Sequence, residues 1–340
     1  MAKIAINGLG RIGRATLKIV MDTPGLDLVA ANDLGTPDEV AYLLKYDTVY
    51  GRYAKTVETR VDGSLVVGGH RLALLREPQP ARLPWQSLAI DIVFECTGAF
   101  TNREDLDDHI RGGARYVILS APSKSEDVET IVHGVNAPEG RSAIISCASC
   151  TTNCITPVME ILGRRLGVKK ATMTTVHAYT ASQAIVDTQR QNARRGRAGA
   201  ANLVPTSTGA ATATARALPE YRGRFDGVAI RAPVPVGSLA DIVVLTEKRT
   251  TVVEVNQIFT EEAASDRYRD VVGVTKDPLV SSDIIKDSRA SVVDLGMTQV
   301  VDGDLVKVLS WYDNEWGYSS QIVREASRIA TAIDRPGRAA

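Results

Sequence analysis

A glycine-rich turn near the N-terminus constrains the fold of this chain more than any other feature of its sequence. The apolar segment Ile4–Ile6 leads into Gly8-Leu9-Gly10-Arg11-Ile12-Gly13, and an apolar helical pattern follows over residues 17–21. A second apolar segment, residues 26–32, ends at Asp33. Strand, glycine turn, helix and strand in this order predict a βαβ unit, and therefore a parallel sheet.

The same pattern predicts a dinucleotide site. Gly8, Gly10 and Gly13 let the turn close and let the backbone approach a pyrophosphate, whose charge is met by free N–H groups at the helix start. Asp33 follows about 20 residues later, where a carboxylate can bind a ribose 2′-hydroxyl and would oppose a 2′-phosphate. The pattern therefore favours a dinucleotide site over a tight surface turn that binds nothing. Within that site it favours NAD over NADP. Ser120 and Thr97 follow later strands, at the sheet edge where such ligands bind.

The length of 340 residues predicts two domains of about 150 residues each. Strands and helices alternate to about residue 149, which predicts an α/β domain with a Rossmann-type doubly wound parallel sheet over residues 1–149. The second part, residues 150–313, predicts an α+β domain with a mainly antiparallel sheet. Its expected strands are 172–177, 227–231, 242–246, 291–294 and 306–311, and its expected helices are 156–166, 209–218 and 252–264.

The charge balance argues against nucleic acid or a membrane surface as a partner. Lys plus Arg number 40 and Asp plus Glu also number 40. No uncharged apolar stretch reaches the length of about 18 residues that a membrane span requires. Four cysteines in so long a chain do not form a disulfide framework, and together with the short apolar start they predict a cytoplasmic protein.

Three of the four cysteines lie in the segment Ser146–Cys154. Cys150 stands where a strand gives way to a helix, and a helix N-terminus can hold a thiol pKa well below its usual value of about 8.5. His177 ends the apolar strand predicted over residues 172–176. We therefore predict Cys150 as a nucleophile and His177 as its base or imidazolium partner.

Other roles for these side chains are less consistent with the sequence. No second Cys or His pair has zinc spacing, so no metal site is expected. A disulfide between Cys150 and Cys154 would be strained, because the two are one helical turn apart. Simple buried thiols are expected at Cys96, Cys147 and Cys154. The remaining histidines are expected on loops or polar, solvated faces: His70, His109 and His133.

Five sequence blocks occur in order along the chain. They are Ile6-Asn7-Gly8-Leu9-Gly10-Arg11-Ile12-Gly13-Arg14, Leu43-Leu44-Lys45-Tyr46-Asp47, Ala148-Ser149-Cys150-Thr151-Thr152-Asn153-Cys154, Ser207-Thr208-Gly209-Ala210-Ala211 and Trp311-Tyr312-Asp313-Asn314-Glu315-Trp316-Gly317-Tyr318. With these blocks the chain resembles the phosphorylating glyceraldehyde-3-phosphate dehydrogenases over nearly its whole length.

The resemblance implies an aldehyde oxidation coupled to phosphorylation. Cys150 would attack glyceraldehyde 3-phosphate, His177 would take the hydroxyl proton as hydride passes to NAD, and inorganic phosphate would release 1,3-bisphosphoglycerate. It also implies three groups of binding residues. The substrate phosphate would be held by Thr180 and Arg231, and the attacking phosphate by Ser149, Thr151, Thr208 and Gly209, with Arg197 near both. NAD would be contacted by Arg11, Ile12, Asp33, Arg76, Ser120 and Asn314.

The resemblance further implies how the chain is organised. The C-terminal segment, residues 314–340, would return to the nucleotide domain as a helix. The arginine-rich loop at about 178–201 would pack against a neighbouring subunit in a homotetramer. Many NAD-specific members have proline where Thr188 follows Asp187, whereas Leu34 keeps their pattern after Asp33. We therefore expect NAD as cofactor, with some use of NADP.

Two other functions remain open from the sequence. Erythrose-4-phosphate dehydrogenases share the nucleophile and the fold, but they usually lack the pair that stands here as Tyr179-Thr180. A non-catalytic binding protein on the same scaffold would have no need to keep Cys150, His177 and Arg231 together.

Overall fold

The computed structural model describes residues 1–138 and 142–333, and the chain forms two compact units. The first unit comprises Met1–Ile131, Pro138–Ala148 and the chain from Ile322 onward, and the second comprises Val132–Ala137 and Ser149–Gln321. The last helix, α7 (Trp316–Ile333), belongs to both units. The part of the predicted C-terminal segment beyond residue 333 lies outside the described residues.

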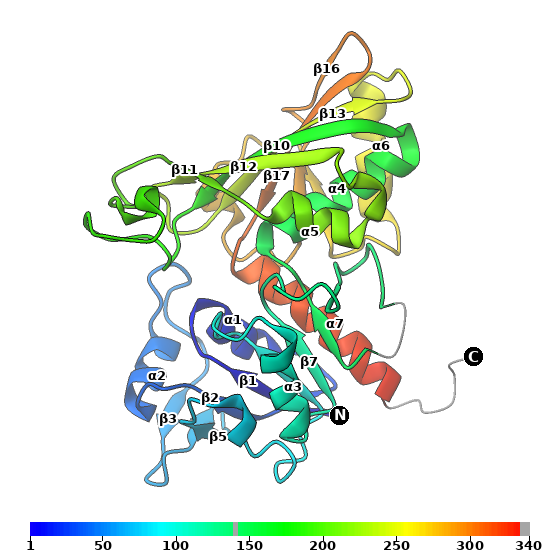
Figure 1. Ribbon diagram of the computed structural model, residues 1–340. Helices are drawn as coiled ribbons and strands as arrows, with labels where there is room; N and C mark the ends of the chain where they lie inside the picture. The colour runs from blue at the N-terminus through cyan, green and yellow to red at the C-terminus, as the bar shows by residue number, and fades with distance from the viewer. Residues whose placement is uncertain (139–141, 334–340) are drawn as a thin grey trace. The chain divides into compact units, whose positions relative to one another are not determined.

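A nine-stranded sheet organises the first unit, in the order β3-β4-β5-β2-β1-β6-β7-β9-β8 (Figure 1). All pairings from β5 to β8 are parallel, as the sequence predicts for a doubly wound sheet. The antiparallel extension through β3 and β4 was not predicted, because two three-residue strands leave almost no periodic signal. The strands are β1 (Ala2–Asn7), β2 (Leu26–Asn32), β3 (Val57–Thr59), β4 (Leu65–Val67), β5 (His70–Leu75), β6 (Ile92–Glu95), β7 (Tyr116–Leu119), β8 (Glu129–Thr130) and β9 (Ile144–Ser146).

In the first unit, helices lead from β1 to β2, from β2 to β3 and from β6 to β7. They are α1 (Arg11–Val20), α2 (Pro37–Lys45) and α3 (Arg103–Arg111), with a short 3-10 turn at Pro80–Arg82. Thr36 caps α2 by accepting a hydrogen bond from the backbone N–H of Glu39, whose side chain accepts one from the backbone N–H of Thr36. By contrast, Gly10 is the N-cap of α1 and supplies no side-chain hydrogen bond to that helix.

The second unit contains a sheet in the order β11-β12-β10-β13-β17-β15-β14, with β16 paired to β17 (Figure 1). The sheet is mainly antiparallel, as predicted, but β10 and β12 are parallel and so are β14 and β15. Its strands are β10 (Val168–Ala178), β11 (Val204–Ser207), β12 (Phe225–Ala232), β13 (Ser238–Thr246), β14 (Val272–Thr275), β15 (Ser291–Asp294), β16 (Gln299–Val301) and β17 (Leu305–Tyr312).

Helix α4 fills the core of the second unit. Its bounds are Cys150–Leu166, so it begins at Cys150, where the sequence placed a helix start, and six residues before the helical pattern predicted over 156–166. Ser149 makes this earlier start favourable, because its hydroxyl accepts a hydrogen bond from the backbone N–H of Thr152 at 3.1 Å. The other helices are α5 (Ala210–Ala217) and α6 (Val252–Ala264), with 3-10 turns at Ala193–Gly196, Pro219–Tyr221 and Ser281–Ile284.

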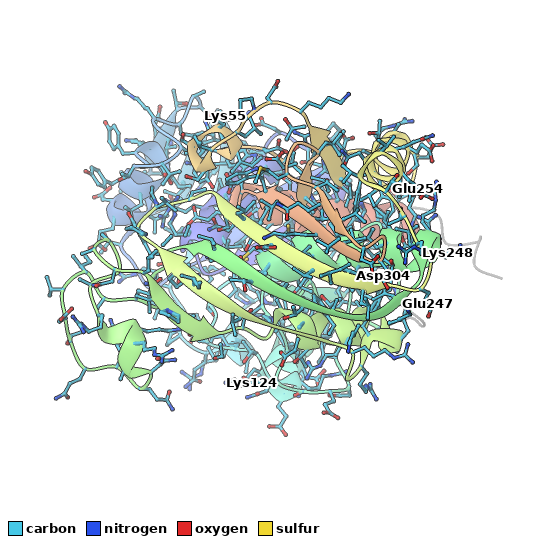
Figure 2. The ribbon with its side chains drawn as sticks, turned by 90° about the horizontal axis from the view of Figure 1, so that it is seen from above. Lys55, Lys124, Glu247, Lys248, Glu254 and Asp304 are labelled. Atoms are coloured by element: carbon cyan, nitrogen blue, oxygen red, sulfur yellow. The ribbon has the colours of Figure 1, made fainter. Side chains whose placement is uncertain are left out.

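The two ends of this second sheet differ in their residues. Figure 2 shows Glu247, Lys248 and Asp304 at the end where β13 stops and β17 begins. His177 lies near the opposite end of β10. Across residues 1–138 and 142–333, the helices are too short or too polar to cross a lipid bilayer.

Candidate active site

Cys150 and His177 meet in the second unit. Cys150 is the first residue of α4 and His177 is the second-to-last residue of β10. The Sγ atom of Cys150 lies 3.3 Å from Nε2 of His177. The two residues predicted as nucleophile and base are therefore in direct contact.

Arg231 joins this pair through the sheet. Strands β10 and β12 run in parallel with His177 opposite Arg231, so the two side chains project from the same face of the sheet. The Nη1 atom of Arg231 lies 2.6 Å from Nδ1 of His177 and 3.1 Å from the carbonyl oxygen of Ala178. The sequence predicted Arg231 near the reaction through family resemblance alone, and strand register explains its position.

Burial sets the protonation of both reacting groups. Burial, together with the positive charge of Arg231, lowers the pKa of His177 to about 3. Burial also raises the pKa of Cys150, although Arg231 and hydrogen bonds at the start of α4 oppose that rise. The expectation of a lowered thiol pKa is therefore wrong for this geometry, because desolvation outweighs the effect of the helix N-terminus. A neutral thiol and a neutral imidazole face each other.

Tyr312 packs beside Cys150 and His177, a contact that the sequence did not reveal. Its hydroxyl lies 2.9 Å from Oγ1 of Thr151 and 2.8 Å from Oγ1 of Thr175, and the edge of its ring approaches His177 with centroids 6.0 Å apart. Tyr312 is 1% exposed, and burial raises the pKa of its phenol. Thr151 therefore directs its hydroxyl into the core, where the phenol keeps it fixed.

Asn314 is buried just after β17 and is linked to β10 through hydrogen bonds. Its carboxamide oxygen accepts hydrogen bonds from Gly237 N at 3.2 Å and from Oγ of Ser238 at 2.9 Å. The same Ser238 hydroxyl accepts a hydrogen bond from the backbone N–H of Ala178 at 3.1 Å. The Ala178 peptide beside His177 is thus held in place by a buried chain of hydrogen bonds.

The remaining predicted phosphate ligands lie on the loop after β10 and at the start of α5. Arg197 is exposed, and its Nε donates to Asp187 Oδ2 at 2.8 Å. Thr208 caps the turn into α5 by accepting from the backbone N–H of Ala210 at 3.2 Å, and exposed Gly209 is the N-cap of that helix. None of these residues contacts the Cys150 side chain directly among the hydrogen bonds of the described residues.

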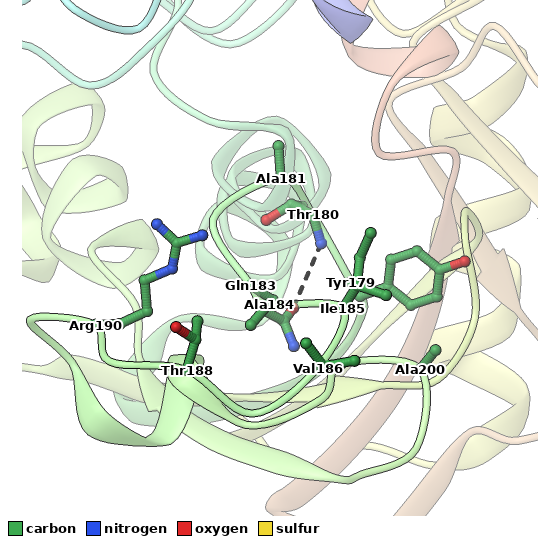
Figure 3. Close-up of a pocket in the computed structure, with 11 residues that line it drawn as sticks. Tyr179, Thr180, Ala181, Gln183, Ala184, Ile185, Val186, Thr188, Arg190 and Ala200 are labelled. Carbon is green, nitrogen blue, oxygen red and sulfur yellow. Dashed lines mark hydrogen bonds between the residues drawn. The ribbon is translucent and has the colours of Figure 1, made fainter.

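The loop after β10 encloses a pocket of about 790 Å³. Figure 3 shows Thr180, Gln183 and Arg190 around it, with a dashed line between Thr180 and Gln183. This line marks a hydrogen bond from the backbone N–H of Thr180 to Oε1 of Gln183, 3.4 Å long. Ile185 and Val186 also line the pocket, and they are 90% and 72% exposed in the single chain. A loop with this much exposed apolar surface is typical of an interface segment.

The other three cysteines form no disulfide, and Cys96 is only partly buried, contrary to the expectation of a buried thiol. Burial raises the pKa of Cys96 and of Cys154 to about 12, and it raises the pKa of Cys147 as well. Cys147 and Cys154 are buried, as the sequence suggested. Residues 1–138 and 142–333 contain no group of three or more His, Cys, Asp or Glu side chains arranged to hold a metal ion.

The predicted nucleotide site forms a pocket of about 440 Å³ in the first unit. Gly8 has φ +90°, and a Cβ there would lie 2.7 Å from the backbone nitrogen of Thr97. A Cβ on Gly13 would lie 1.9 Å from the carbonyl oxygen of Gly8. Side chains at these two positions would prevent the turn from closing. The pocket lining includes Gly8, Gly10, Asn32, Asp33, Leu34, Glu77, Thr97 and Phe100.

Asp33 ties the glycine turn to the end of β2. One carboxylate oxygen accepts from the backbone N–H of Leu9 at 2.7 Å and the other from Gly35 N at 2.9 Å. Arg11 is turned towards Asp47, with Nη1 2.6 Å from Oδ2. The other predicted NAD ligands are placed as follows: Ile12 is half-buried on α1, Arg76 donates to the carbonyl oxygen of Leu34 at 3.1 Å, and Ser120 is half-buried directly after β7.

A buried carboxylate underlies this pocket, and the sequence gave no signal for it. Glu95 is 0% exposed and accepts hydrogen bonds from Nδ2 of Asn7 at 2.6 Å and from the backbone N–H of Thr97 at 2.7 Å. It also accepts from the Thr97 hydroxyl and contacts Nε2 of His109 at 3.1 Å. Trp85 can only donate, and its Nε1 lies 3.0 Å from Nδ1 of His109, so Nε2 carries the proton of a neutral ring.

The expectation of a solvated His109 is therefore wrong. Its side chain is 0% exposed, because it bridges Trp85 in the core and Glu95 beneath the glycine turn. The polar sequence of α3 concealed this, since a single inward-facing position in a charged helix does not show in the hydrophobic period. His70, in contrast, is half-exposed at the start of β5.

Comparison with known proteins finds matches to both parts of the chain. The family model for the NAD binding domain of glyceraldehyde 3-phosphate dehydrogenase matches residues 2–103, and the model for its C-terminal domain matches residues 149–314. The chain is 45% identical over 325 residues to a glyceraldehyde-3-phosphate dehydrogenase of Streptomyces coelicolor, covering 94% of this chain and 96% of that protein. It is 44% identical over 337 residues to the protein of that name from Clostridium pasteurianum, covering 97% and 99%. The Geobacillus stearothermophilus protein of that name is 44% identical over 334 residues, covering 97% and 98%.

Proposed function

Because the chain belongs to the glyceraldehyde-3-phosphate dehydrogenase family, we propose that it oxidises D-glyceraldehyde 3-phosphate to 1,3-bisphosphoglycerate with NAD and inorganic phosphate. The observation that carries this proposal is the 3.3 Å contact between Sγ of Cys150 and Nε2 of His177. A thiol against an imidazole, at the start of a helix, is the arrangement that covalent catalysis on an aldehyde requires.

The chemistry follows from these two side chains. The sulfur of Cys150 bonds to the aldehyde carbon while its thiol proton passes through Nε2 of His177 to the carbonyl oxygen, and the resulting hemithioacetal then loses its hydroxyl proton to the same nitrogen. Bound NAD supplies the acceptor for the hydride that leaves the same carbon. The thioester on Cys150 keeps the free energy of oxidation until a phosphate oxygen attacks its carbon. The carbon–sulfur bond then breaks, releasing the acyl phosphate and restoring Cys150.

The turn after β1 fits the pyrophosphate of NAD. The close approach of Gly8 to Thr97 lets the backbone come near a diphosphate, and the positive end of the α1 dipole at this turn favours its negative charge. An ionised carboxylate has about four acceptor positions, so Asp33 can bind ribose hydroxyls while it holds Leu9 and Gly35. We assign the remaining NAD contacts to residues around this turn and beyond it: Gly10, Arg11, Ile12, Gly13, Arg76, Ser120 and Asn314.

The two phosphate groups require donors on the second unit. Arg231 is the strongest candidate for the substrate phosphate, because its buried Nε has no hydrogen-bond partner among the described residues. Arg197 can contribute only by exchanging its partner Asp187 for an anion. We assign the remaining phosphate contacts to hydroxyl and backbone donors at the starts of α4 and α5 and on the loop after β10: Ser149, Thr151, Thr180, Thr208 and Gly209.

We propose the catalytic domain over residues 150–313, and the NAD-binding domain over residues 1–149 together with the C-terminal segment 314–340. A homotetramer is supported by the exposed apolar loop around Ile185 and Val186. A cytoplasmic location is supported by the four free cysteines, which suit a reducing compartment. The relatives described above are named for glyceraldehyde 3-phosphate, which favours that substrate over erythrose 4-phosphate.

A rapid-mixing experiment tests the covalent route. With NAD and glyceraldehyde 3-phosphate but without inorganic phosphate, each chain should form about one NADH and then stop, because the thioester cannot leave Cys150. Adding phosphate should restore turnover. The Cys150→Ser variant should show no burst. Sustained turnover without phosphate, or an unchanged burst in this variant, would refute the proposed mechanism.

A further inference from the structure

A buried network of hydrogen bonds, here called the Glu95 network, crosses the sheet edge beneath the nucleotide pocket of the first unit. Asn7, Asn32 and Glu95 are the last residues of β1, β2 and β6, which pair in parallel and therefore end at the same edge. Nδ2 of Asn32 donates to Oδ1 of Asn7 at 2.7 Å, and Nδ2 of Asn7 donates to Oε2 of Glu95 at 2.6 Å. Each of the three residues is 4% exposed or less, so these polar groups bind one another instead of water.

Both ends of the network are fixed by groups that can only donate. The backbone N–H of Glu77 donates to Oδ1 of Asn32 at 2.8 Å, so the amide of Asn32 must turn its NH₂ group towards β1. At the other end, Nε1 of Trp85 donates to Nδ1 of His109, which leaves Nε2 of the neutral ring as the donor to Glu95. The hydrogen bonds from both ends therefore point towards the carboxylate, which fixes the two amides and the tautomer of the ring.

Glu95 receives four donors, two at each carboxylate oxygen. Asn7 and His109 donate to Oε2, and the backbone N–H and the hydroxyl of Thr97 donate to Oε1. An ionised carboxylate offers about four acceptor positions, so all of them are in use. Because Glu95 is 0% exposed, the loss of any one donor would leave an acceptor position that water does not reach.

Thr97 connects the network to the pocket. Thr97 and Gly8 both line the pocket, and the backbone nitrogen of Thr97 would lie 2.7 Å from a Cβ on Gly8. At the other end, Asn32 directly precedes Asp33, the carboxylate that we assign to a ribose, and both line the same pocket. A fully satisfied buried network makes its surroundings rigid. The parts of the pocket near Thr97 and near Asp33 should therefore keep their positions without a ligand.

We propose that His109 is a positioning residue for the dinucleotide. Its ring is 0% exposed, and it acts on the pocket through Glu95, which holds Thr97 beside the glycine turn and Asn7 beside Asn32. The pocket is thus formed before NAD arrives, and a preformed site loses less freedom on binding. This inference rests on the proposed function, since it takes NAD to be the occupant of this pocket.

His109→Phe tests the proposal, because phenylalanine keeps a ring in the same space but neither donates to Glu95 nor accepts from Trp85. The Kd for NAD, measured by calorimetric titration, should rise about tenfold, as expected for one lost buried hydrogen bond. KM for NAD should rise with it, while kcat at saturating NAD and KM for glyceraldehyde 3-phosphate should stay at the values of the parent. An unchanged Kd, or a fall in kcat without a change in KM for NAD, would overturn the proposal.

His109→Gln is the conservative variant. Its carboxamide can both donate to Glu95 and accept from Trp85, so most of the affinity for NAD should return. A Kd for His109→Gln as high as that for His109→Phe would show that the hydrogen bonds of the ring do not set the affinity.

Leu106→Ala is the matched control for a loss of stability alone. Leu106 lies on α3 three residues before His109, is 0% exposed, and packs with Val117 and Leu119 in a separate hydrophobic cluster. The variant should have a lower melting temperature because it leaves a cavity, but the Kd of the parent for NAD. A rise in Kd equal to that of His109→Phe would contradict a positioning role.

Hydrogen exchange in the parent protein supplies a measurement that does not depend on the folding of any variant. The backbone N–H of Thr97 should be protected before NAD is added, because Glu95 accepts its hydrogen bond. Exchange of this N–H as fast as that of an exposed amide, with protection only after NAD is added, would contradict a preformed pocket. A parent that does not bind NAD would refute the proposed function and this role together, whereas a parent that binds NAD as tightly as its His109→Phe variant would refute this role alone.

Discussion

At the scale of single residues, burial controls the protonation of His177 and Cys150, the pair proposed to carry the reaction. His177 is 4% exposed and sits between Cys150 and Arg231, so protonating it would place a second positive charge beside a buried guanidinium. The ring stays neutral in the folded chain to a pKa of about 3. Because His177 has a lower pKa in the folded chain than in the unfolded chain, the free energy of unfolding should depend on pH.

The direction of that dependence follows from the two pKa values of His177. The unfolded value is about 6.5 and the folded value is about 3, so between them the unfolded chain binds more protons. The contribution to stability is fully present above pH about 6.5 and is lost as the pH falls towards 3. His177→Gln removes this titration, so its free energy of unfolding should fall less than that of the parent between pH 6.5 and 4.5. Denaturant titrations measure this, and equal losses in the two proteins would contradict the assignment.

At the scale of elements, the turn between β1 and α1 depends on close backbone packing. A Cβ on Gly13 would overlap the Gly8 carbonyl oxygen, whereas nothing lies within 4 Å of a Cβ on Gly10. Gly13→Ala should therefore destabilise the protein by about 1–3 kcal/mol and weaken NAD binding. Gly10→Ala should change stability by less than about 0.5 kcal/mol. Thermal unfolding and NAD titration of both variants test this pair, and equal melting temperatures would argue against the packing explanation.

The carboxylate below the same turn gives a second prediction at this scale. Glu95→Gln replaces an acceptor oxygen with an NH₂ group that faces donors from Asn7, Thr97 and His109. The loss should be about 1–3 kcal/mol of stability, with a higher dissociation constant for NAD because Thr97 loses its anchor. The exposed Glu104→Gln serves as the control and should change neither quantity. A Glu95→Gln variant that matches this control would show that the buried hydrogen bonds do not support the pocket.

These elements also show which parts of the molecule could be predicted from the sequence. The parallel sheet, the glycine turn and the mainly antiparallel second sheet follow from local patterns, since strands of four or more apolar residues carry a clear period. Glu95 and Tyr312 were missed because their roles arise only when distant segments pack together. The raised pKa of Cys150 was missed for a related reason: helix position is visible in a sequence, but desolvation depends on the neighbours that folding supplies.

At the scale of the whole molecule, we expect four chains to associate. The native mass should be four times the chain mass of 36.5 kDa. Replacing Ile185 and Val186 together with aspartate should lower that mass, because both side chains are largely exposed in the single chain and charges oppose burial at an interface. Val61→Asp changes a fully exposed valine outside this loop and should leave the native mass unchanged. Light scattering after size-exclusion chromatography measures all three proteins, and a monomeric parent would exclude the proposed assembly.

The proposed reaction requires both NAD binding and the thiol of Cys150 in the same molecule. Steady-state NADH formation from glyceraldehyde 3-phosphate, with and without inorganic phosphate and with NAD or NADP, tests this most directly. We expect sustained turnover only when phosphate is present, a preference for NAD, and no activity in Cys150→Ser. Activity in Cys150→Ser equal to that of the parent, or a parent enzyme that turns over equally well without phosphate, would contradict the account.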